Sequence, residues 1–140
     1  MKAKTYSNLL LAIVVILFSS CDKNDYKESQ KFIGCWINPV YTSDVDEKTF
    51  ISFEKTNVLS DDFGIEFVKK GSFIERKMSG WCATPPVIYA DYSGNWNVEN
   101  ENIIINVAYW GGIENRIWKI IDVTDTTLKI EVVLQEYDNR

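Results

Sequence analysis

The recurrence of apolar residues at every second position is the feature that most constrains the fold of this chain. It is clearest near the C-terminus, at Leu128, Ile130, Val132 and Leu134. A period of two is typical of a β-strand that buries one face and exposes the other. No stretch after Phe32 shows a sustained apolar period of 3.6 residues, so the sequence predicts an all-β fold.

Turn signals divide the chain from Phe32 onward into about eight short strands. Gly111-Gly112 can adopt the positive φ angles of a tight hairpin, which predicts that the next strand folds back antiparallel. Pro85 and Pro86 lack amide donors and exclude a central strand there. A meander of this kind closes most simply into a small antiparallel up-and-down β-barrel, which removes exposed strand edges. The predicted strands are Phe32 to Ile37, Thr49 to Lys55, Gly64 to Lys69, Ser72 to Met78, Val87 to Trp96, Ile103 to Tyr109, Arg116 to Val123 and Leu128 to Leu134.

The first 20 residues have the layout of an export signal. Lys2 and Lys4 give a positive start, and an apolar run from Leu9 to Phe18 leads through two serines to Cys21. The run is much shorter than the roughly 20 residues that a membrane-spanning helix needs. We therefore expect residues 1–20 to be a signal peptide that is removed.

The junction before Cys21 resembles a bacterial lipobox, in which cleavage exposes a cysteine that carries a diacylglycerol. Phe18 stands where that motif usually has leucine. The resemblance implies that Cys21 is lipidated and that acyl chains anchor the protein in the cell envelope, for which we expect the outer membrane. Asp22 fits either inner-membrane retention or surface export, so the leaflet stays open. The alternative is an ordinary secretory signal followed by an unrelated cysteine.

Behind Cys21, residues 21–31 are predicted to be a flexible tether, because the segment from Asp22 to Lys31 has almost nothing to bury. Residues 32–140 are then a single barrel domain, a size that can bury a sizeable core. The formal charge of −5 becomes −7 once Lys2 and Lys4 are removed, leaving 13 basic and 20 acidic residues. This excess disfavours nucleic acid as a partner, and membrane attachment must come from the acyl chains.

Using Cys21 for the lipid leaves Cys35 and Cys82 as an even pair in an oxidising compartment. A disulfide between them would close a long loop and stabilise the domain by roughly 4 kcal/mol. Two buried free thiols are the alternative. The chain contains no histidine, and two cysteines alone make a poor zinc site, so no metal is predicted.

Catalytic signals are weak in this sequence. No histidine is present to act as a base near pH 7, and no G-x-S-x-G nucleophile elbow occurs. The acidic clusters Asp44-x-Asp46-Glu47 and Asp61-Asp62 could offer oxygens to Ca²⁺, but they lack the spacing of a dedicated loop and are better explained as solvated turns. Paired carboxylates could still hydrolyse glycosides if the fold brought them together. We predict a non-enzymatic protein without a cofactor.

The five tryptophans can be core residues or can line a ligand pocket. Trp36 and Trp118 have the positions of core residues, and Trp81 lies beside Cys82, where it would pack on the disulfide. The remaining two are equally compatible with a barrel mouth, together with nearby tyrosines, or with an aromatic patch for a protein or a glycan. These residues are Trp96, Trp110, Tyr89, Tyr92 and Tyr109.

Gly34-Cys35-Trp36 resembles the G-x-W signature of lipocalins, in which the tryptophan plugs the closed end of an eight-stranded barrel. The segment from Trp81 to Pro86, and the run from Ser93 to Ile130, are similar to small lipocalin-like lipoproteins of Bacteroidota-type bacteria. Ala90-Asp91-Tyr92 is a faint counterpart of the lipocalin T-D-Y box, with alanine in place of threonine. The resemblance implies that a ligand would enter at the end away from Trp36. The candidate ligand-binding residues are Tyr92, Trp96, Tyr109 and Trp110.

Two functions of different class follow from these expectations. The first is a lipid-anchored, lipocalin-like module that binds a small apolar or amphipathic ligand inside its barrel. The second is an envelope interaction protein, such as an inhibitor, immunity factor or accessory subunit, whose barrel is filled. An open cavity near 300 Å³ or more would favour the first.

Overall fold

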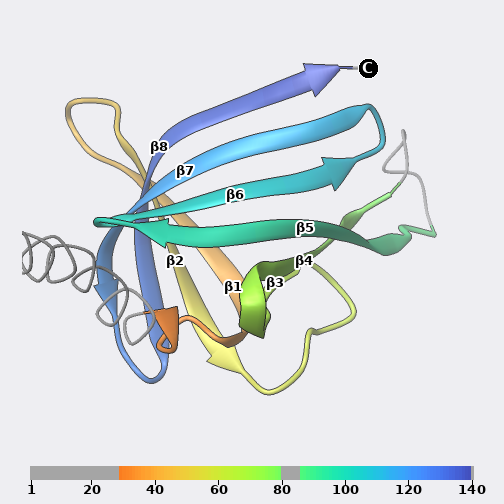
Figure 1. Cartoon of the computed structure of the whole chain (residues 1–140), viewed down its shortest axis with the longest axis horizontal. Coiled ribbons are helices and arrows are strands. Elements are labelled where there is room, and N and C mark those ends of the chain that lie inside the picture. Colours follow the sequence, from red (N-terminus) through yellow and green to blue (C-terminus); the bar gives the residue numbers. More distant parts are fainter. Residues whose placement is uncertain (1–28, 80–85, 140) are drawn as a thin grey trace, which may run out of the picture.

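The computed structural model describes residues 29–79 and 86–139, and within them eight antiparallel strands close into a barrel (Figure 1). This confirms the predicted all-β barrel. One short 3₁₀ turn, Lys69–Gly71, connects two of the strands. The strands are β1 (Gly34–Ser43), β2 (Thr49–Thr56), β3 (Gly64–Phe67), β4 (Ser72–Met78), β5 (Tyr89–Glu99), β6 (Asn102–Tyr109), β7 (Gly112–Val123) and β8 (Thr127–Asn139).

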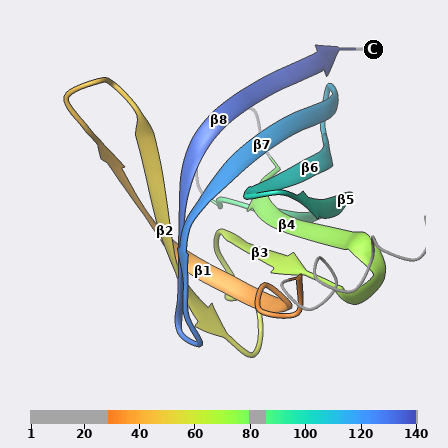
Figure 2. The ribbon, with the colours of Figure 1, turned by 60° about the vertical axis from the view of Figure 1, so that its left-hand side comes forward.

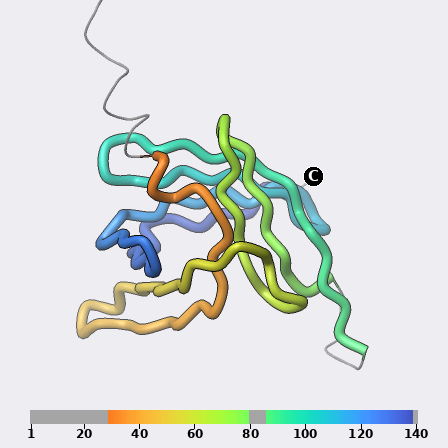
Figure 3. The backbone as a smooth tube through the Cα atoms, turned by 90° about the horizontal axis from the view of Figure 1, so that it is seen from below, coloured from red at the N-terminus to blue at the C-terminus, as the bar shows by residue number. Residues whose placement is uncertain are grey.

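The strand order around the barrel is β1-β2-β8-β7-β6-β5-β4-β3, and β3 closes the circle by pairing with β1. Strands β3 to β8 form a continuous meander. β1 lies between β2 and β3, so the connection from β2 to β3 crosses β1 (Figure 3). β3 covers the edge of β1 from Gly34 to Ile37, which leaves that part of the edge paired.

The predicted antiparallel hairpin forms, with Tyr109 paired to Gly112 and the turn made by Trp110 and Gly111, although only Gly112 of the glycine pair has a positive φ. Gly112 has φ 154°, and a Cβ on Gly111 would lie 2.7 Å from the Tyr109 ring, so both positions favour glycine. β7 therefore begins at Gly112, four residues before the predicted start at Arg116. The first buried residue of β7, Glu114, is charged, and for this reason the apolar pattern did not extend the predicted strand to Gly112.

One end of the barrel is filled by aromatic side chains around Trp36, which is completely buried. The Trp36 indole Nε1 donates a hydrogen bond to the Phe32 carbonyl at 2.7 Å. Phe67 lies against Phe32 and Trp96, with ring centroids 6.2 and 4.8 Å away in edge-to-face geometry. The expected core role of Trp36 at a closed end is therefore confirmed, and Trp118 is also buried in the core.

The other end of the barrel is splayed. The β1–β2 register shifts between Ile37 and Val40, where Asn38 has φ 53°, and the distal part of this hairpin turns away from the barrel. Pairing of β2 with β8 stops at Phe50 and Glu131. Figure 2 shows the hairpin and the C-terminal part of β8 diverging from each other. The barrel is therefore closed at its Trp36 end and open between these two elements.

Candidate functional site

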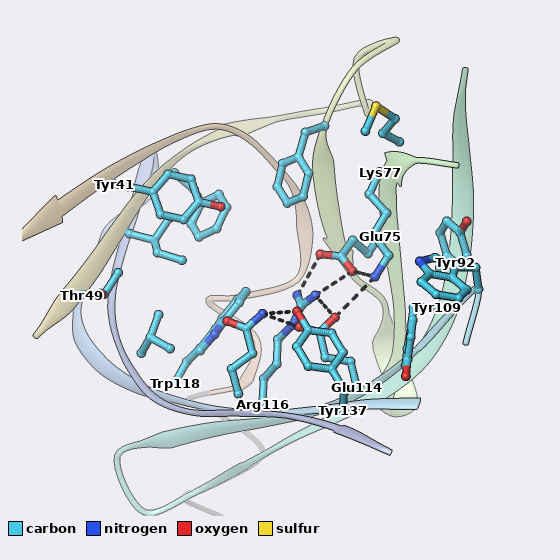
Figure 4. A pocket seen from close by; sticks show the side chains of 17 residues that line it. Tyr41, Thr49, Glu75, Lys77, Tyr92, Tyr109, Glu114, Arg116, Trp118 and Tyr137 are labelled. Atoms are coloured by element: carbon cyan, nitrogen blue, oxygen red, sulfur yellow. Dashed lines mark hydrogen bonds and ion pairs between the residues drawn. The ribbon is translucent and has the colours of Figure 1, made fainter. Parts of the chain in front are cut away.

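The open end of the barrel contains a cavity of about 400 Å³ (Figure 4). Side chains from β1, β2, β4, β5, β6, β7 and β8 line it, so it belongs to the barrel interior. Trp36 is not among them, which places the cavity beyond the filled end. The lining residues are Tyr41, Thr49, Ile51, Phe53, Phe63, Glu75, Lys77, Met78, Tyr92, Tyr109, Trp110, Glu114, Arg116, Trp118, Val132, Gln135 and Tyr137.

A cluster of four charged side chains forms one wall of the cavity: Glu75, Lys77, Glu114 and Arg116, called here the charged cluster (Figure 4). Arg116 donates to both oxygens of Glu75 at 2.8 and 2.9 Å and to both oxygens of Glu114 at 2.7 Å. The Lys77 ammonium lies 2.7 Å from Glu75 Oε2 and 3.5 Å from Glu114 Oε2. Each carboxylate is thus held by two cations.

Burial makes this pairing necessary. Glu75 and Glu114 are 1% and 2% exposed, and Arg116 is 8% exposed. An unpaired charge at such depth would be strongly unfavourable, whereas two carboxylates and two cations sum to zero formal charge. Among the described residues no buried side-chain polar atom lacks a hydrogen-bond partner.

The charged cluster also fixes protonation states. Burial alone would raise the pKa of Glu114, but hydrogen bonding and charge from Arg116, with help from Lys77 and Gln135, hold that pKa below its usual value. Burial would lower the pKa of Arg116, yet the two carboxylates raise it further above its ordinary range. Glu114 and Arg116 therefore stay ionised and paired at neutral pH.

Two residues of β8, Gln135 and Tyr137, extend the charged cluster along the cavity. Gln135 Nε2 donates to Glu114 Oε1 at 2.7 Å and to the Tyr137 hydroxyl at 2.8 Å. The Lys77 ammonium also lies 5.0 Å from the centre of the Tyr92 ring, a cation–π distance. The charged cluster together with Gln135 and Tyr137, called here the polar wall, thus includes residues of β4, β7 and β8.

Aromatic side chains form the rim of the cavity. Tyr109 packs edge-to-face on both Trp110 and Tyr137, with ring centroids 5.9 and 5.3 Å apart. Trp110 is 72% exposed, and Tyr41 and Tyr137 are also more than half exposed. Exposed aromatic rings beside an open cavity offer rigid apolar contact area to a ligand.

The structure places three of the four candidate ligand-binding residues together. Tyr92, Tyr109 and Trp110 all line the cavity. Trp96 lies instead in the filled end, where it packs against Phe67 and its indole Nε1 donates to the Val68 carbonyl at 3.0 Å. Its position on β5 is inward-facing but several residues nearer the closed end, which explains the wrong placement.

The predicted disulfide is not seen. Cys35 is buried and its thiol is free, and the other cysteines, Cys21 and Cys82, lie outside the described residues. Cys35 alternates with the inward-facing Trp36 and so points outward from β1. There burial, together with the negative charge of Glu66, raises the pKa of the Cys35 thiol. The bridge stays a prediction, as does the packing of Trp81 on it.

The acidic turn at Asp44 has a structural explanation. Asp44 Oδ1 accepts hydrogen bonds from the backbone amides of Asp46 and Lys48 at 2.9 and 3.0 Å, which organises the β1–β2 turn. Within residues 29–79 and 86–139, no group of three or more metal-binding side chains comes together. No helix in the same residues is long and apolar enough to span a membrane.

Sequence reasoning missed the charged cluster, which dominates one cavity wall. A signal was present: on β7, Glu114 and Arg116 stand in alternation with the buried Trp118, and on β4, Glu75 alternates with the buried Phe73. Charged residues at core-facing positions of a strand are costly unless they pair, so opposite charges on two such strands indicate a buried ion pair.

No protein-family model, curated protein or solved structure matches the chain. The fold and the site by themselves define a small antiparallel β-barrel that is filled at one end and holds a mixed polar and aromatic cavity at the other.

Proposed function

We propose that this protein is a lipid-anchored, lipocalin-like lipoprotein of the cell envelope that binds a small amphipathic molecule in its barrel cavity. The observation that carries the proposal is the cavity of about 400 Å³ at the open end, which is within the size range of small-molecule sites. It combines buried apolar residues, an aromatic rim and a few fixed polar groups, the usual composition of such sites. The alternative, an interaction protein, was expected to have a filled barrel, whereas this barrel contains a cavity.

The binding proposal predicts that the environment-sensitive dye N-phenyl-1-naphthylamine enters the cavity with a rise in fluorescence. Trp110→Ala should weaken dye binding several-fold because it removes an exposed aromatic ring from the rim. Titration of the dye into each variant gives the dissociation constants. The matched control is Tyr89→Ala, which removes another exposed aromatic ring at a position that does not line the cavity.

Absence of dye binding, together with native mass spectrometry of envelope-purified protein that shows only the bare chain, would contradict the binding proposal. A protein that co-purifies in stoichiometric amount, again without a small molecule, would favour the interaction function instead.

The anchoring part of the proposal depends on Cys21 and the tether, which lie outside the described residues. Attachment through two or three acyl chains is firm, since each buried CH₂ contributes about 0.8 kcal/mol. We expect Cys21→Ser to move the protein from the membrane fraction to the soluble fraction. Fractionation and intact-mass measurement check this, and a mature chain with an unmodified Cys21 would overturn it.

A further inference from the structure

The two sides of the cavity differ in chemistry. On one side, β2 contributes Ile51 and Phe53, which we call the apolar wall. On the other side lies the polar wall, formed by the charged cluster with Gln135 and Tyr137. Both walls include almost fully buried side chains, since Phe53 and Glu75 are 2% and 1% exposed. Apolar and charged side chains on different strands therefore both line the enclosed part of the cavity.

The polar wall offers hydrogen-bond donors to a ligand. All four oxygens of Glu75 and Glu114 already accept hydrogen bonds from Arg116, and both Oε2 atoms also face Lys77. An ammonium has three N–H groups, and the two carboxylates engage two of those on Lys77. The Lys77 side chain is also the most exposed of the cluster, at 20%. Its third N–H is thus available to a ligand that accepts hydrogen bonds.

The zero formal charge of the cluster favours neutral acceptors over an ionic group, because a buried ionic group would be left without a counter-charge. We propose that the ligand of the cavity is a facially amphipathic molecule, with an apolar face against Ile51 and Phe53 and hydroxyl or carbonyl groups along the opposite face, one of which accepts a hydrogen bond from Lys77. This inference rests on the proposed function and specifies its ligand class. A simple head-and-tail amphiphile matches this cavity less well, because its tail would lie along the charged cluster.

A pair of steroid acids tests the proposal. Cholate carries three hydroxyl groups on one face, and 5β-cholanate has the same skeleton and carboxylate without them. Each is titrated against the bound dye in the unmodified protein and in Lys77→Met, which keeps the aliphatic stem and removes the donor. We expect Lys77→Met to weaken cholate about tenfold, the effect of one charge-assisted hydrogen bond, and to change cholanate less than about twofold.

Two further variants test whether the effect of Lys77→Met comes from the lost hydrogen-bond donor. Lys77→Arg keeps donors at the same place and should retain most of the cholate affinity. Lys119→Met makes the same change at an exposed position of β7 and should alter neither ligand. Because the dye reports cavity integrity in every variant, a misfolded variant is recognised by loss of dye binding.

The outcomes separate the two proposals. If Lys77→Met weakens the binding of cholate and cholanate equally, Lys77 binds the carboxylate or only supports the fold. That result would overturn the inference of a facially amphipathic ligand. The inference is also wrong if the dye binds but cholate does not displace it, while the binding function stands. If the dye itself does not bind, the proposed function fails first.

Discussion

Replacing Arg116 with methionine should lower the free energy of unfolding by about 3–5 kcal/mol, because it leaves two buried carboxylates without their main partner. Arg116 makes four hydrogen bonds of 2.7 to 2.9 Å to Glu75 and Glu114, which are almost completely buried. Lys77 alone would then face two negative charges. Urea unfolding at pH 7, followed by tryptophan fluorescence, measures the change.

Two comparison variants separate lost pairing from lost packing. The triple variant Glu75→Gln, Glu114→Gln, Arg116→Met keeps side-chain sizes but removes the buried charges, and it should recover most of the lost stability. Arg76→Met removes an arginine whose Asp91 ion pair lies at the surface, with its side chains 26% and 48% exposed, and should change stability far less. If Arg116→Met unfolds at nearly the same urea concentration as the unmodified protein, the buried cluster is not formed as described.

The charged cluster bears on function through the same energetics. Well-packed apolar residues in place of a buried ion pair are often neutral or stabilising, so stability alone does not require Glu75, Glu114 and Arg116 in this barrel. These residues also line the cavity, where Glu75 and Glu114 hold the Lys77 ammonium beside the space that a ligand would fill. Stability and ligand preference therefore depend on overlapping residues, and Lys77 is the member whose loss should affect binding more than folding.

Much of the fold could be predicted because strand alternation is local. Ser72–Met78 has the predicted bounds, and other strands begin or end within a few residues of the prediction. The predicted start of β7, at Arg116, was wrong because the preceding inward position is occupied by Glu114, where the apolar pattern requires a hydrophobic residue. The order of β1, β2 and β3 around the barrel could also not be predicted, because the pairing of β1 with β3 depends on contacts between residues far apart in the sequence.

The site was predictable only in part, and for a related reason. The G-x-W resemblance correctly indicated which end is closed, and from it the aromatic residues beside the Gly111-Gly112 turn could be placed at the other end. Depth along the barrel axis cannot be read from alternation, which specifies a face and not a level. Trp96 shares the inward face of β5 with Tyr92, yet it lies at the filled end while Tyr92 reaches the cavity.

A second large effect is expected at the filled end, where Trp36→Ala should lower the free energy of unfolding by about 3–5 kcal/mol. The Trp36 ring is fully buried among the aromatic residues that fill this end, and its removal leaves a cavity that the closed strands cannot collapse to fill. The indole hydrogen bond to the Phe32 carbonyl is lost as well, leaving a buried acceptor. Thermal and urea unfolding measure the loss.

Trp110→Ala provides the matched control, because it makes the same change at the open end, where the ring is 72% exposed. It should leave the free energy of unfolding within about 0.5 kcal/mol of the unmodified protein. The two substitutions are expected to separate the roles of the two ends: Trp36→Ala lowers stability, whereas Trp110→Ala weakens dye binding in a protein that unfolds normally. Comparable losses of stability from both would mean that the Trp110 ring is buried in solution, closing the cavity mouth, and would remove the structural basis for ligand entry at this end.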